Sequence, residues 1–121
     1  MSYLAEKFEA AVRRLVGDGP VKQRLVQAYA QHLDDLRDGD MPGPLKGDYA
    51  ALDAAMHRSP PIGKESSIKI TVQKMSFAEA SAHAESIVKL YAEVLRSAER
   101  GEPLKVVHSD EPSPRYLAGG Q

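Results

Sequence analysis

The ten residues SSIKITVQKM, numbered 66–75, decide whether this chain is wholly helical or contains a β-sheet. The apolar residues alternate with polar ones and are mostly β-branched, which favours a strand. Ile68, Val72 and Met75 are also spaced as on one face of a helix, and Ser66 is a suitable N-cap. A strand needs a hydrogen-bonding partner, and only a short apolar run near the C-terminal end offers one. We therefore favour a short helix and keep a strand as the alternative.

Four longer segments on either side have the apolar spacing of amphipathic helices. Apolar residues recur every three or four positions in residues 3–16, 20–37, 44–58 and 77–100. A Gly-Asp-Gly-Pro turn between the first two helices predicts an antiparallel hairpin. Ser76 and Glu79 form a capping-box pattern at the start of the longest helix, and the buried face predicted for this helix begins at Phe77.

These segments predict a mainly α protein of one domain. We expect a compact bundle of four to five helices over residues 1–101. Residues 102–121 are rich in Pro, Ser, Gly and charge, which predicts an extended, disordered tail. Only 30 of the 121 residues are Leu, Val, Ile, Met or Phe, which suits one small core.

Charge and cysteine content exclude several functional classes. Sixteen basic and 17 acidic residues give a net charge of −1, without the basic excess typical of nucleic-acid-binding proteins. The absence of cysteine excludes disulfides, thiol catalysis and cysteine-ligated metals. No apolar run reaches the roughly 18–20 residues of a membrane span, and no signal peptide is recognisable. We expect a soluble, cytoplasmic protein with no membrane partner.

Few residues offer catalytic or metal-binding chemistry. Glu79 and His83 lie one helical turn apart and provide two potential metal ligands in a central cavity, with His32 as a third. A closed site needs about four ligands, and a hydrogen-bonded structural histidine is the more ordinary interpretation. His32 also lies close to Asp34 and Asp35, but no nucleophile accompanies this group. We therefore predict no catalytic residue, no metal site and no cofactor.

The charges are unevenly distributed along the chain. Residues 34–53 contain two basic and six acidic residues, whereas residues 54–75 contain four and one. The aspartates in the first segment do not match a calcium-binding loop, because two of its oxygen ligands are missing. His57 is explained as a cation at a helix C-terminus. Two of the aspartates lie near a helix C-terminus and need a basic partner, for which we expect Arg37, Lys46 or Arg58.

Amphipathic helices without a catalytic set of residues favour a non-enzymatic protein–protein interaction or regulatory module. We expect a homodimer, because the core is light in large residues. Val106 lies in a short apolar run suited to adding a strand to the sheet of a partner. The sequence also predicts a short docking motif in the tail, so the predicted partner-binding residues are Val106, Arg115, Tyr116 and Leu117. Alternatively, the apolar run is a terminal strap that docks on the bundle, and the rest of the tail is a loose end without a partner-binding role.

Two other functions stay open from the sequence. One is a small helical metal- or ligand-binding protein or enzyme that uses Glu79 and His83. The other, less favoured because of the net charge, is a nucleic-acid accessory protein that uses a group of basic residues near the first turn, namely Arg13, Arg14, Lys22 and Arg24.

Overall fold

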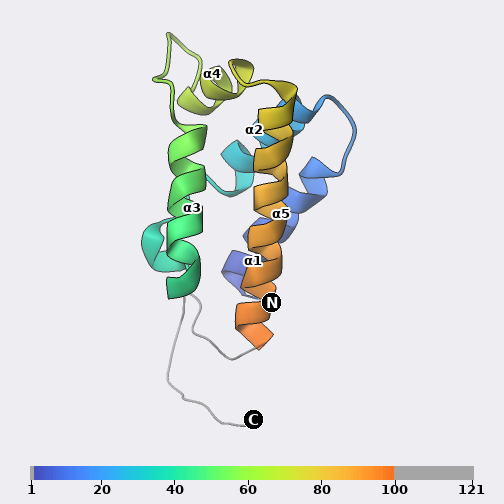
Figure 1. Cartoon of the computed structure of the whole chain (residues 1–121), viewed down its shortest axis with the longest axis vertical. Helices are drawn as coiled ribbons and strands as arrows, with labels where there is room; N and C mark the ends of the chain where they lie inside the picture. The colour runs from blue at the N-terminus through green and yellow to red at the C-terminus, as the bar shows by residue number, and fades with distance from the viewer. Residues whose placement is uncertain (1, 100–121) are drawn as a thin grey trace.

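A computed structural model describes residues 2–99, which form five α-helices joined by short connections (Figure 1). The helices are α1 (Tyr3–Leu15), α2 (Val21–His32), α3 (Gly43–Met56), α4 (Ser67–Gln73) and α5 (Phe77–Glu99), with a 3-10 turn, Asp38–Asp40, before α3. Residues 2–99 include no β-strand; one isolated bridge pairs Ile62 with Glu65. The predicted mainly α bundle is therefore confirmed.

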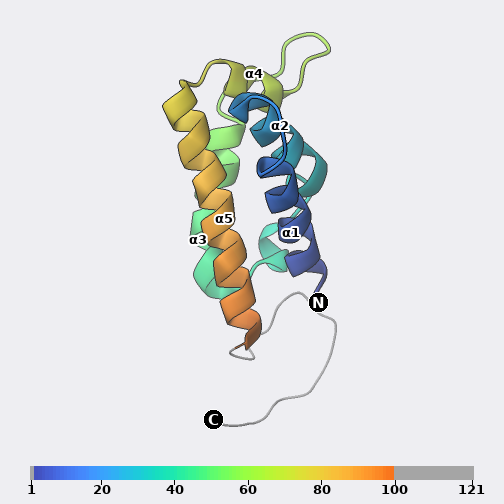
Figure 2. The ribbon, with the colours of Figure 1, turned by 90° about the vertical axis from the view of Figure 1, so that its right-hand side faces the viewer.

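The four longer helices pack as a bundle, and α4 covers one end of it. Helices α1 and α3 run toward the end that α4 covers, while α2 and α5 run away from it (Figures 1 and 2). Helix α1 packs closely on α2 and α5, and α3 packs on α5 and α4. The backbones of α2 and α3 make few close contacts, so side chains must connect these two helices.

The ambiguous segment forms the helix α4, and the alternative of a strand is wrong. The Ser66 side chain accepts a hydrogen bond from the Lys69 amide at 3.1 Å, as an N-cap does. The Thr71 hydroxyl accepts a hydrogen bond from the Ser59 amide at 2.9 Å. More than half of this short helix is buried, namely Ile68, Ile70, Thr71 and Val72. Tertiary burial thus outweighs the local preference for a strand.

The core consists of the predicted helical stripes, with one clear exception. Its largest fully buried side chains include Leu4, Phe8, Leu25, Tyr29, Leu33, Met56, Ile87 and Val94. Phe77 was predicted to begin the buried face of α5, but it is 67% exposed. As the first residue of α5 it extends past the packed part of the helix, and the Lys22 ammonium lies 5.0 Å from its ring centre.

Within residues 2–99, no helix is both long enough and apolar enough to cross a bilayer. The predicted domain boundary near residue 101 lies outside the described residues. The same is true of the tail residues predicted to bind a partner, Val106, Arg115, Tyr116 and Leu117.

Candidate functional site

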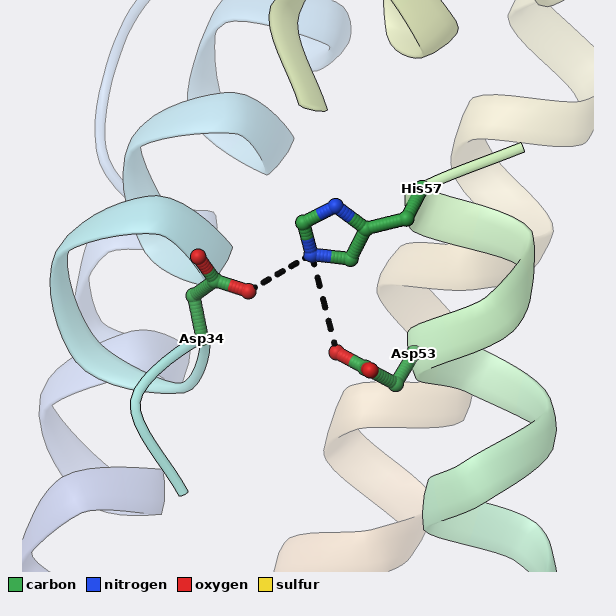
Figure 3. A group of neighbouring side chains, drawn as sticks. All are labelled: Asp34, Asp53 and His57. Atoms are coloured by element: carbon green, nitrogen blue, oxygen red, sulfur yellow. Dashed lines mark hydrogen bonds and ion pairs between the residues drawn. The ribbon is translucent and has the colours of Figure 1, made fainter. Parts of the chain in front are cut away.

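A polar cluster connects the C-terminal end of α2 to the C-terminal half of α3. His57, the C-cap of α3, forms a hydrogen bond through Nε2 with Asp34 Oδ1 at 2.7 Å, and the same nitrogen lies 3.8 Å from Asp53 Oδ1 (Figure 3). We call Asp34, Asp53 and His57 the histidine–aspartate cluster. Their potential ligand atoms all lie within 4.8 Å of one another. The side chains of His57, Asp34 and Asp53 are 35%, 38% and 42% exposed, so solvent reaches all three.

Two buried tyrosines hold this cluster from the core side. The Tyr29 hydroxyl donates a hydrogen bond to Asp53 Oδ1 at 2.5 Å. The Tyr49 hydroxyl donates to two carbonyl oxygens on either side of Asp34, at 2.8 Å to Leu33 and 3.2 Å to Leu36. Tyr29 therefore orients one carboxylate, and Tyr49 fixes the turn that carries the other.

Burial keeps both phenols protonated at neutral pH. It raises the pKa of Tyr49 to about 12, with the nearby aspartates adding to the shift. Burial raises the pKa of Tyr29 still further, and the hydrogen bond to Asp53 adds to this effect. Both hydroxyls are consequently dependable hydrogen-bond donors over the whole physiological range.

The aspartates after α2 have partners other than those the sequence predicted. Asp34 contacts His57, whereas Asp35 receives Lys7 Nζ at 2.7 Å and 2.9 Å from its two carboxylate oxygens. The hydrogen bond from Lys7 lowers the pKa of Asp35. Arg58, one of the expected partners, instead lies 3.8 Å from Glu79. The predicted partners all follow the aspartates in the sequence, whereas the packing of α1 against α2 places Lys7, 28 residues before Asp35, beside this carboxylate.

The pair Glu79 and His83 does not gain a third ligand in the described part of the chain. The Glu79 carboxylate turns back to accept a hydrogen bond from the Ser76 amide at 3.1 Å, which completes the predicted capping box. His83 lines a groove of about 600 Å³ between α3 and α5. Among residues 2–99, three metal-ligand donors come together only at the histidine–aspartate cluster, so His32 does not join Glu79 and His83.

The four basic residues of the nucleic-acid hypothesis make contacts within the fold. Arg13 pairs with Glu9 at 3.2 Å, and Arg14 bonds Gln27 and the carbonyl oxygen of Asp18. Arg24 donates to carbonyl oxygens at the end of α1 and in the turn that follows. The contacts of Arg14 and Arg24 hold the α1–α2 hairpin together, whereas the ion pair of Arg13 lies within α1.

Lys22 belongs to a second candidate surface, a groove between α2 and α4. The volume of this groove is about 430 Å³, and it is lined by Lys22, Gln23, Val26, Gln27, Lys69, Val72 and Gln73. The Lys22 ammonium also donates to the carbonyl oxygen of Gln73 at 3.2 Å and lies over the ring of the exposed Phe77. Lysine, glutamine and valine side chains thus adjoin an exposed aromatic ring.

Sequence reasoning missed the histidine–aspartate cluster. Asp53 and His57 have the same four-residue spacing as Glu79 and His83, and this spacing was the available signal. Asp34 is 23 residues from His57, and no local pattern connects them.

Neither the protein-family models nor the curated proteins searched give a match to this chain, and no solved structure matches it.

Proposed function

We propose that this chain is a non-enzymatic interaction module whose α2–α4 groove binds an acidic, partly apolar segment of a partner protein. The observation that carries this proposal is the exposure of Phe77 beside a groove with cationic and amide walls. Exposed aromatic residues next to a groove are typical anchors of protein interfaces.

The residues of the groove suit such a segment. Val26 and Val72 provide apolar contact, and the amide groups of three glutamines provide hydrogen bonds. Lys22 and Lys69 supply positive charge, and no acidic residue lines the groove. Lys69 does form an ion pair with Glu65 at 3.5 Å, but both side chains are about half exposed, and such pairs contribute at most about 1 kcal/mol. A carboxylate of a partner can therefore compete for this lysine.

Charge also favours a different protein over a second copy of this chain at the groove. A two-fold symmetric contact centred there would bring the Lys22 and Lys69 side chains of both copies together. Like charges in such a contact are unfavourable, whereas a partner that carries Asp or Glu avoids this repulsion. The homodimer expected from the sequence is thus the competing arrangement for this face.

Fluorescence anisotropy with the full chain tests the proposal. The probe is a synthetic amphipathic peptide with Glu on one face and Leu on the other, and its control is the same peptide with Lys for Glu. We expect only the acidic peptide to bind. Phe77→Ser and Lys22→Gln should each weaken binding by about tenfold or more, because Lys22 lines the groove and Phe77 lies beside it.

Val88→Ser is the matched control, because Val88 is another exposed apolar residue of α5, at 44% exposure. It should leave binding unchanged. Equal binding of both peptides, or full binding by the Phe77→Ser variant, contradicts the proposal. A dimer in sedimentation equilibrium that Phe77→Ser dissociates would assign this face to self-association instead.

A further inference from the structure

We propose that the histidine–aspartate cluster binds a divalent transition-metal ion, with Zn²⁺ best suited to its donors, and that the ion links α2 to α3. The proposal concerns a different surface from the α2–α4 groove and does not depend on the proposed function. It rests on the donor geometry, on the local charge and on the two tyrosines that hold the donors.

The donor atoms are close to the positions that zinc needs. Zinc binds histidine nitrogen and carboxylate oxygen at about 2.0–2.2 Å, which places neighbouring donors of a tetrahedral site about 3.4 Å apart. In the cluster, the Nε2 of His57 lies 2.7 Å from the Asp34 oxygen and 3.8 Å from the Asp53 oxygen, on either side of that value. The three donors lie within 4.8 Å of one another, so an ion that draws these partly exposed side chains inward would complete the set. A water molecule from the solvent side would complete the tetrahedron.

The local charge favours a cation. Asp34 follows the C-terminal end of α2, and Asp53 lies in the last turn of α3, so both carboxylates add to the negative ends of two helix dipoles. A single ion pair with His57 requires one carboxylate, but both are turned toward the same ring nitrogen (Figure 3). With neutral imidazole, the three side chains carry a charge of −2, which a divalent ion balances. The nearest further carboxylate in sequence, Asp35, is already paired with Lys7.

The tyrosines restrict the donors in the way that supporting residues do in known metal sites. Carboxylate ligands are usually oriented by hydrogen bonds from neighbouring groups. Tyr29, which is fully buried, makes that bond to Asp53, and Tyr49 binds the carbonyl groups of Leu33 and Leu36 in the turn that carries Asp34. An ion held here would connect two helices whose backbones make few close contacts, and would therefore stabilise the bundle.

Titration calorimetry of the full chain with ZnCl₂, after treatment with a chelator, tests this inference. We expect one zinc ion per chain and a rise in the midpoint of thermal unfolding when zinc is present. Asp34→Asn and His57→Gln should each weaken zinc binding by at least about 100-fold, and Tyr29→Phe should weaken it by about tenfold to 100-fold. Substitution with Co²⁺ gives a visible absorption band whose loss in His57→Gln reports coordination by that histidine.

His83→Gln is the matched control, because His83 is a partly exposed histidine outside the cluster. It should bind zinc as the unsubstituted chain does. The proposal is overturned if zinc leaves the unfolding midpoint of the unsubstituted chain unchanged. It is also overturned if Asp34→Asn and His57→Gln, folded by circular dichroism, bind zinc as tightly as the unsubstituted chain.

Discussion

The hydrogen bond between Tyr29 and Asp53 gives a quantitative test, because its two partners differ in burial. Tyr29 is fully buried, whereas the Asp53 side chain is 42% exposed. Tyr29→Phe leaves a carboxylate that water still reaches, so we expect a loss of about 0.5–1.5 kcal/mol in the free energy of unfolding. Asp53→Ala leaves a buried hydroxyl without its carboxylate acceptor, and this costs about 1–3 kcal/mol.

The single substitution of Asp53 also has favourable effects that must be separated. It removes a negative charge from the C-terminal end of α3, which stabilises the helix by about 0.3–1 kcal/mol. Alanine also has the better helix propensity, by up to about 0.7 kcal/mol. Both effects are the same with Tyr or Phe at position 29, so they cancel in a double-mutant cycle.

We expect a coupling free energy of about 1 kcal/mol from the cycle, toward the lower end of the range for contacting residues. The lower end applies because the Tyr49 hydroxyl lies close enough to Tyr29 to affect its pKa. In Asp53→Ala, the Tyr49 oxygen can therefore accept a hydrogen bond from Tyr29, which offsets part of the loss.

The four proteins of the cycle are the unsubstituted chain, Tyr29→Phe, Asp53→Ala and the double variant. Their unfolding in urea at neutral pH with a chelator, followed by circular dichroism, measures this coupling. In a parallel cycle, Asp53→Ala is combined with Tyr91→Phe, which changes a half-buried tyrosine of α5. The free-energy effects of these two substitutions should be additive. A coupling below about 0.3 kcal/mol between Tyr29 and Asp53 would refute the reasoning, because it would show that the hydrogen bond contributes nothing measurable.

Three further predictions follow from the core, a helix cap and a tyrosine pKa. Phe8→Ala should lower the free energy of unfolding in urea by about 3–5 kcal/mol because Phe8 is fully buried, whereas Phe77→Ala should change it by less than about 0.5 kcal/mol; equal losses would contradict the assigned burial. Ser76→Ala should cost about 1 kcal/mol in the same assay, because the Glu79 amide loses its cap; an unchanged midpoint would refute this. Tyr49 should ionise near pH 12 in a near-ultraviolet titration, and a titration near its ordinary pKa of 10.0 would contradict its burial. Because folding raises this pKa, the stability it contributes is complete below pH 10 and is lost between about pH 10 and pH 12.

Most of the fold was predictable from the sequence, because its signals are local. Ser76 and Glu79 form the cap hydrogen bonds predicted for the start of the longest helix, and Ser66 caps α4 as expected. Apolar spacing of three and four residues identified the buried faces correctly for most positions. The predicted burial of Phe77 was wrong. Periodicity assigns a residue to a face of the helix, but it does not show how far along the helix the packing partner extends.

The histidine–aspartate cluster was not predictable from these signals. It depends on how the chain after α2 lies against the C-terminal half of α3, and this is set by the packing of two helices whose own backbones make few close contacts. Predicting the ion pair between Asp35 and Lys7 likewise required the position of α1. Charge patterns in one dimension indicated that the aspartates need cations, but only the tertiary arrangement identifies which cations reach them.

The helix α4 has a consequence for the behaviour of the unfolded chain. Its seven residues, SIKITVQ, alternate apolar and polar side chains and are rich in β-branched residues, and their helical state depends on burial at the end of the bundle. Once the bundle opens, the segment regains its preference for extended structure and exposes isoleucine and valine to other chains. Short segments of this kind pair readily between molecules as cross-β aggregates. Lys69 is the one charged residue within the segment, so it acts as the internal gatekeeper that opposes such pairing.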